Sequence, residues 1–467
     1  MDSLPPELLA KIASFLPCTH DLISLRLVNK QYAAIASRPL FEVLRFSGLR
    51  QDQVPPWNFG PSPEPSLPAG HHKRTRTVEF GKLAEVVDEI VAKSIARSTK
   101  TFVFDPAYYR EGFWRDYFLH RENEMNEPID EVDYMPDSDS DGEGWNSALE
   151  CALDYRQARP EREADTVEVV RALWAEKTAE QKQNEEAIVA ALEKLFRLMT
   201  VLEEIEIKPW VFDGRLLFPG LESCISYAVD IQRRDSFPCT FFVQILARAL
   251  RAVGRRIKHL RVSEFFADQL RDTPDTRHLF TGLQTIRLDM PHVEFLSDEA
   301  KGSQVLVELF KCAQPTLRHF SIVGGGKWPH HPARGGHSLL KMLSNEVGGA
   351  DETPLAFPQL SFVCFGGLIM STPPLLQFLR AQPSLKKLEF SNIYLSTRGA
   401  GWPSLVEALP MNVESWNVCG PLGHEPLEMD GPTAYNWMTS WEPDKLSHSL
   451  GWIAQSHKHG TNFVRVS

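Results

Sequence analysis

The sequence predicts an α/β protein: a short helical module at the N-terminus, followed by a long array in which strands and helices alternate. Two observations lead to this prediction. Apolar residues in the first 46 positions recur at helical spacing. Further along the chain, short strand-like phrases share one apolar spacing, and a stretch with helical periodicity precedes most of them. The length of 467 residues and the hydrophobic content of 43% are sufficient for packed domains of this kind.

The N-terminal module is predicted to contain three short helices. Pro5 suits the first turn of a helix, where a missing N–H costs nothing, and Pro17 ends that helix. Asp21 is a suitable N-cap for a second helix, and a third surrounds residues 32–35 before Pro39. The apolar stripes of the first two helices consist of Leu8, Leu9, Ile12, Phe15, Leu16, Leu22, Leu25 and Val28.

This segment, residues 1–47, resembles an F-box. The resemblance lies in Leu4-Pro5, Glu7, Leu8, Ile12, Leu16, Asp21-Leu22, Leu25-Arg26 and Val28. It departs from the family pattern near the end of the second helix, where the frequent Cys and Trp are Asn29 and Tyr32. The resemblance implies a surface that faces a Skp-type adaptor and, through it, a cullin; it would comprise Leu4, Pro5, Leu8, Ile12, Phe15, Leu16, Leu22, Leu25 and Val28. The alternative is that these helices are a cap over the neighbouring domain.

Residues 48–74 are expected to form a linker. Six prolines between Gln51 and Gly70 favour a semi-extended chain over a packed element. The basic cluster His71 to Arg74 that follows is interpreted as the solvated end of this linker.

Seven phrases with the spacing L-x-x-L-x-L, with apolar substitutes, predict strands in residues 75–420. Two of them are almost identical, Ala313–Ile322 and Ala381–Phe390. The phrases are Leu202/Ile205/Ile207, Ile257/Leu260/Val262, Leu283/Ile286/Leu288, Leu317/Phe320/Ile322, Leu360/Val363/Phe365, Leu385/Leu388/Phe390 and Val413/Trp416/Val418. Thr75/Val78/Phe80 and Thr99/Phe102/Phe104 fit less well and predict two more strands.

Helical stripes precede these strands, for example at residues 83–95, 188–199 and 241–253. A strand-plus-helix unit cannot bury both of its faces, whereas stacked units share a continuous core. The chain therefore resembles an irregular leucine-rich-repeat protein, which implies a solenoid of strand–helix units. It departs from the family pattern after each strand, where an Asn or Cys is usual and Trp210, Phe265, Pro291, Gly325, Leu368, Ile393 and Pro421 stand instead. The side chains expected on the opposite face include Gln284, Arg287, Arg318, Ser321, Lys386 and Glu389.

An acidic insertion and a tail interrupt this pattern. Residues 106–160 are expected to be disordered in part, because Glu122–Glu143 holds ten acidic and no basic residues. Ser138 and Ser140 in this run are followed by acids and are predicted phosphorylation sites. Residues 421–467 contain Trp437, Trp441 and Trp452, and are predicted to cap the open end of the repeats or to form an aromatic peptide-binding patch.

Composition excludes several functional classes. The net charge is −11, but without the ten acids of the insertion the chain has 51 acidic and 50 basic residues, a net charge of −1. The sequence therefore lacks the basic excess that is typical of nucleic-acid-binding proteins. No apolar run reaches a membrane span, and no signal peptide is expected. The seven cysteines lack metal spacing and are typical of an intracellular protein, so a cytoplasmic or nuclear location is predicted. No cofactor or metal is predicted: Asp137–Gly142 lacks the final glutamate of a calcium loop, and Gly324–Lys327 is not a phosphate loop.

The two resemblances together imply a non-catalytic substrate-recognition subunit of an SCF-type (Skp adaptor–cullin–F-box) ubiquitin ligase, which binds a protein substrate through its repeats. Two alternatives stay open. The chain is a scaffold that binds partners without promoting their ubiquitination, or an enzyme that uses the Gly324–Gly336 loop or the tryptophan-rich tail. The sequence does not identify the substrate.

Overall fold

The computed structural model contains helices and strands along the chain from Val43 to Arg465. It describes residues 41–47, 78–92, 95–109, 143–208, 239–263, 265, 267–290, 299–324, 339–340, 343–344, 354–396, 402–425, 452–457 and 460–465, together with Leu9, Lys11, Ala13, Ser24, Leu25, Val28, Tyr32, Ile35 and Ala36. The predicted fold class is confirmed in its coarser form, because the structure is mixed α/β with a parallel sheet and several helices.

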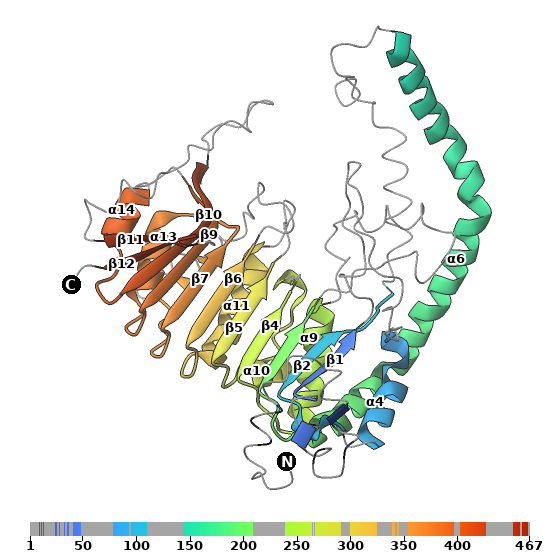
Figure 1. The fold of residues 1–467 in the computed structure, drawn as a ribbon, viewed down its shortest axis with the longest axis horizontal. Coiled ribbons are helices and arrows are strands. Elements are labelled where there is room, and N and C mark those ends of the chain that lie inside the picture. The colour runs from blue at the N-terminus through green and yellow to red at the C-terminus, as the bar shows by residue number, and fades with distance from the viewer. Residues whose placement is uncertain are drawn as a thin grey trace.

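The described strands form one sheet of twelve, in which β1 to β7, β9 and β10 lie side by side in chain order and pair in parallel (Figure 1). An antiparallel β12 then pairs with β10, and β11 pairs with β12. The strands are β1 Val43–Ser47, β2 Thr101–Asp105, β3 Glu204–Ile207, β4 His259–Val262, β5 Thr285–Asp289, β6 His319–Val323, β7 Phe362–Gly366, β8 Ile369–Met370, β9 Lys387–Ser396, β10 Ser415–Glu425, β11 Trp452–His457 and β12 Gly460–Arg465.

Helices separate most of the parallel strands. The described helices are η2 Phe80–Lys82, α4 Leu83–Ala92, η3 Ile95–Ser98, α6 Glu143–Leu198, α9 Cys239–Ala252, η6 Ala267–Gln269, α10 Pro274–Phe280, α11 Glu299–Ala313, α13 Thr372–Arg380 and α14 Trp402–Glu407. Between α9 and β4 the chain reverses at Gly254, whose φ of +65° lies in the left-handed region that glycine adopts without strain.

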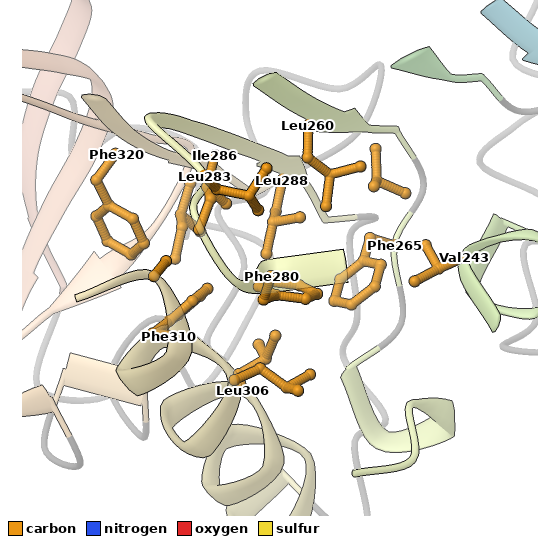
Figure 2. Packing of buried hydrophobic residues seen from close by; sticks show 14 of the residues in the cluster. Val243, Leu260, Phe265, Phe280, Leu283, Ile286, Leu288, Leu306, Phe310 and Phe320 are labelled. Carbon is orange, nitrogen blue, oxygen red and sulfur yellow. The ribbon is translucent and has the colours of Figure 1, made fainter. Parts of the chain in front are cut away.

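The seven repeat phrases mark strands, as predicted. The first apolar residue of each phrase lies in the turn before its strand, and the other two lie in the strand or at its end. In β5 these residues are Leu283, Ile286 and Leu288, and all three are fully buried. Figure 2 shows how they pack with Leu260 of the neighbouring strand and with side chains of the helices, such as Phe310. Because each phrase packs against the next, the core runs without a break along the sheet.

Neighbouring units are also joined by polar contacts in the turns before the strands. An unbroken series of backbone hydrogen bonds links the residues that precede successive strands, from Glu42 to Glu414. Beside it, side chains immediately before the first apolar residue of a phrase donate to a carbonyl of the preceding unit. These contacts are Thr316 Oγ1 to Leu283 O, Gln359 Nε2 to Pro315 O, Ser384 Oγ to Pro358 O and Asn412 Nδ2 to Pro383 O and Leu385 O. This ladder lies at the start of the strands, whereas the asparagine that the sequence lacks would follow them.

The end of the N-terminal module contributes the first strand of the sheet. β1, which precedes residues 48–74, already pairs in parallel with β2, from Val43 with Thr101 to Ser47 with Asp105. Phe46 is buried in the core between Phe102 and Phe104. The N-terminal module therefore joins the sheet before the proline-rich stretch, which runs between β1 and the region of η2 and lies outside the described residues.

One strand prediction is wrong. Thr75/Val78/Phe80 does not mark a strand, because the 3-10 helix η2 begins at Phe80 and only Glu79 forms a bridge, with Ala107. Within residues 106–160, where disorder is expected in part, α6 begins at Glu143. Residues 143–159 are rich in Ala, Leu, Glu and Arg, which favour a helix once the acidic run has ended. β10 also continues past the predicted boundary at residue 420, to Glu425.

The long helix α6 packs on the sheet only in its C-terminal part, and its N-terminal part leads away from the sheet (Figure 1). Gln181 fixes the contact: its buried amide accepts from the backbone N–H of Tyr109 at 2.7 Å and donates to the Tyr109 carbonyl at 2.8 Å. Lys177 pairs with Glu79 at 2.7 Å, and Trp174 packs edge-on against the Tyr109 ring. α6 thus supplies the core stripe of the β3 unit, which includes Leu192 and Leu195.

Candidate functional site

The sheet has a second face, opposite the buried phrases, that carries mostly polar side chains. We call it the open face. The strand register arranges its side chains in rows that cross the strands. The first row is Thr101, Glu204, His259, Thr285, His319, Phe362, Lys387 and Ser415, and the second is Val103, Glu206, Arg261, Arg287, Ser321, Cys364, Glu389 and Asn417. Of the residues predicted for this face, Arg287, Ser321 and Glu389 lie in the second row. Gln284, Arg318 and Lys386 directly precede the strands.

Ion pairs link the charges of the second row across β3, β4 and β5. Glu206 accepts from Lys208 and from Arg261, each at 3.2 Å. Asp289 accepts from Arg287 at 3.0 Å and lies 3.9 Å from the second Arg261 nitrogen. Each carboxylate in this network therefore has two cationic neighbours, and the network satisfies its own charges.

Asp105 is the buried acid of this region. It is 8% exposed, and its Oδ1 accepts no hydrogen bond. Burial raises the pKa of its carboxyl to about 8, although Arg45 on β1 and Lys208 after β3 act in the opposite direction. At neutral pH this carboxyl is mostly protonated, so it adds little negative charge to the open face.

At the start of the strands the charges differ. The residue directly before β4, β6 and β9 and the first residue of each of these strands are all basic or titratable, and we call these six the basic rim. They are Lys258, His259, Arg318, His319, Lys386 and Lys387. The corresponding residues of β5 and β7 are neutral, and the rim is bounded by acids: Glu203 and Glu204 before it and Glu414 after it.

Two cations of the basic rim, one on β6 and one on β9, have no acidic partner among the described residues. Within the described part of the chain, no carboxylate lies within 4 Å of Arg318 or Lys387, and Arg318 Nε makes only a 3.4 Å contact with Gln359. Burial lowers the pKa of His319, and His259 and Arg318 lower it further. His259 and Arg318 disfavour a positive charge on His319, which indicates that this part of the surface is locally positive.

Cys364 lies between Ser321 and Glu389 in the second row, on the strand between theirs. Its Sγ donates to Glu389 Oε1 at 3.7 Å. Burial raises the pKa of the thiol to about 12, and Glu389 adds to the effect. A neutral thiol is a poor nucleophile, so the site does not favour cysteine chemistry.

Only part of the predicted adaptor surface falls on described residues. Leu25 is half-buried against Ala13 and Ala36, so it packs within the N-terminal module itself. Val28 is 63% exposed and is available for a partner. Leu4, Pro5, Leu8, Ile12, Phe15, Leu16 and Leu22 lie outside the described residues.

Comparison with known families identifies the N-terminal module. Residues 1–46 match the family model described as F-box-like. The chain thus carries an F-box-like domain, and the coarser part of the sequence-based recognition is confirmed. The match ends at Phe46, so the F-box-like domain includes most of β1. No curated protein matches the chain.

The remaining predicted motifs yield no further site. Ser138, Ser140, the Asp137–Gly142 motif and the histidines of the Gly324–Gly336 loop lie outside the described residues, as do Trp437 and Trp441. The described residues contain no group of three or more His, Cys, Asp or Glu that could hold a metal ion. Among the described helices, none combines the length and the apolarity that a membrane span needs.

Sequence reasoning missed the basic rim as a unit. Its residues extend from Lys258 to Lys387 and come together only through the strand register. A local signal exists, because each pair follows the first apolar residue of a repeat phrase by one or two positions. Aligning the phrases and comparing those two columns would have revealed it.

Proposed function

We propose that the chain is a substrate-recognition subunit of an SCF-type ubiquitin ligase. The observation that carries this proposal is the match of residues 1–46 to the F-box-like family. The F-box-like domain would dock to a Skp-type adaptor and, through it, to a cullin. The chain would act by proximity: it would supply no catalytic residue, and it would hold a protein substrate near the charged ubiquitin-conjugating enzyme.

The sheet would be the substrate-binding part, as an irregular leucine-rich-repeat-like solenoid. The regular succession of parallel strands and the continuous core support this interpretation. β1 would have a particular role, since it lies at the end of the F-box-like domain and also pairs with β2. It would place the adaptor-binding domain directly beside the first strands of the sheet.

Adaptor capture tests the first half of the proposal. Leu8→Asp with Ile12→Asp should lower capture of a purified Skp-type adaptor at least about tenfold, because each change removes an apolar contact of about 1.5–3 kcal/mol. Val28→Asp should also weaken capture without changing the melting temperature, since Val28 is exposed. Met411→Asp, at a position 85% exposed in a turn before β10, is the matched control. Unchanged capture by the Leu8/Ile12 variant would sink the proposal.

A truncation provides a second test, and its design follows from β1. Removing residues 1–40 deletes the helices but leaves Phe41 to Ser47 in place to cover the edge of β2. This shorter chain should lose the adaptor and keep its other partners.

The alternative is an F-box scaffold that binds partners without promoting their ubiquitination. A bound partner should accumulate in cells when Leu8 and Ile12 are both changed to Asp if the ligase proposal is right. A partner that binds the chain but whose amount and ubiquitination do not change would favour the scaffold.

A further inference from the structure

The basic rim brings six basic or titratable side chains together, and two of its cations, Arg318 and Lys387, have no acidic partner among the described residues. We propose that it binds an extended acidic segment of a protein partner. This inference rests on the proposed function, since it names the kind of substrate that the open face would take.

The spacing of the basic pairs matches an extended peptide. One strand, β5 or β7, separates β4 from β6 and β6 from β9. Strands in a sheet lie about 4.8 Å apart, so the pairs recur about every 10 Å. A chain in the extended polyproline II conformation advances about 3.1 Å per residue and has three residues per turn, so every third side chain lies on one face and would meet a basic pair. The preferred partner would carry acids at positions i, i+3 and i+6.

The cations of the basic rim differ in charge balance. Lys258 pairs with Glu203 at 2.6 Å and Lys386 with Glu414 at 2.9 Å. These pairs are exposed and contribute little to stability, so a ligand carboxylate can replace them at small cost. Arg318 and Lys387 offer cations that the described residues leave unpaired. The acids at both margins would repel an acidic peptide that slid out of register.

The residues around the basic pairs favour a peptide over a nucleic acid. Thr285 is hydrogen-bonded to His259 Nδ1 at 3.0 Å, and Phe362 lies edge-on against His319. The acids at both margins of the basic rim, Glu203, Glu204 and Glu414, limit it to three basic pairs, which suits a short acidic segment better than a long phosphate backbone.

His319 makes binding pH-dependent. His319 faces His259 on β4, Thr285 on β5 and Phe362 on β7, with Arg318 beside it, and its pKa lies below the usual 6.5. An acidic ligand favours the protonated form, so affinity should increase as the pH falls from 7.5 to 5.5.

The test is fluorescence anisotropy with the full chain and a labelled peptide that carries glutamates at every third position between neutral residues. Arg318→Glu should weaken binding at least about tenfold, Lys387→Glu should act in the same direction, and both should keep the wild-type melting temperature. The matched control is Arg271→Glu, the same charge change at an exposed position before α10, which should bind as the wild type does. Equal affinities for Arg318→Glu and Arg271→Glu would overturn the proposal.

Three comparisons make the test specific. A peptide with its glutamates contiguous should bind more weakly; equal binding would overturn the spacing argument. A single-stranded oligonucleotide of equal charge should also bind more weakly, and tighter binding would identify the rim as a nucleic-acid surface. Binding seen only after deletion of residues 122–142 would mean that the chain's own acidic run occupies the rim. The assay needs neither adaptor nor ubiquitin, so its failure is distinct from failure of the proposed function.

Discussion

The two copies of the Ala-Gln-Pro phrase, residues 313–322 and 381–390, are nearly the same sequence but hold their glutamines in different ways. Gln314 is half-buried, and its amide donates once, to Ala356 O at 2.6 Å. Gln382 is 1% exposed. Its amide accepts from the Phe357 N–H at 2.8 Å and donates to Leu355 O and Phe378 O at 2.9 and 2.8 Å.

Both glutamines bind the same short segment, residues 355–357, from the two units that flank β7. They hold this segment in front of β7. The apolar positions of the two copies agree, because the three apolar residues of each phrase face the same continuous core. The polar positions differ, because their partners belong to the neighbouring unit. The sequence of one repeat therefore determines which of its residues enter the core. Its polar contacts depend also on the sequence of the neighbouring repeat.

The largest expected effect concerns the central core position, which is Phe320 in one copy and Leu388 in the other. Phe320 is fully buried and packs against the rings of Phe310, Phe357, Phe365 and Phe378. Phe320→Ala should cost about 3–5 kcal/mol of unfolding free energy and Leu388→Ala about 2–4 kcal/mol, because the larger side chain leaves the larger cavity. Urea unfolding at 25 °C measures both. A larger loss for Leu388→Ala would contradict the idea that the copies share one core.

The glutamines test the polar half of the comparison. Gln382→Ala should cost about 2–3 kcal/mol, because it leaves the buried Phe357 N–H and the Leu355 carbonyl without this partner, whereas the Phe378 carbonyl keeps the Ala381 N–H. Gln314→Ala should cost only about 0.5–1 kcal/mol, the usual net value of one hydrogen bond. The control is Gln377→Ala on the exposed side of α13, which should change stability by less than about 0.5 kcal/mol. Equal losses at Gln314 and Gln382 would show that the repeat, and not the neighbour, sets the contact.

The same distinction explains what the sequence predicts well. Apolar spacing located the strands of all seven phrases, since an alternating strand needs only its own residues to show which side is buried. It missed β1, although Phe41, Leu44 and Phe46 have the same spacing as the phrases, because this strand lies inside the segment that resembles an F-box. It also missed α10, whose start at Thr273-Pro274 combines an N-cap with a proline at the first helical position.

The candidate site was harder to predict because it is made by register. Arg287, Ser321 and Glu389 were placed on the open face by alternation alone. Which charges would pair could not be predicted, because Glu206 and Arg261 are distant in sequence and meet only when β3 and β4 align. The sequence-wide charge count hid the basic rim for the same reason.

The smallest expected effect at neutral pH concerns Cys364, which lies between the two copies. Burial raises the pKa of its thiol from 9.0 to about 12, so the folded chain keeps the proton that the unfolded chain loses first. The contribution to stability is complete below pH 9 and decreases as the pH rises from 9 toward 12. At pH 8.5, iodoacetamide should alkylate Cys364 at least about a hundredfold more slowly in the folded chain than in urea, as peptide mass mapping would show.

Glu389→Gln separates the two causes of this shift. The carboxylate of Glu389 also raises the pKa of the thiol, but burial is the larger cause. Removing the charge should therefore increase the alkylation rate of folded Cys364 by no more than about tenfold, which corresponds to about one pKa unit. Recovery of the unfolded rate in this variant would mean that Glu389, a residue of the second copy, controls a side chain of the strand before it. The pKa of a side chain in this row would then depend mainly on charges of the neighbouring strand and not on its own burial.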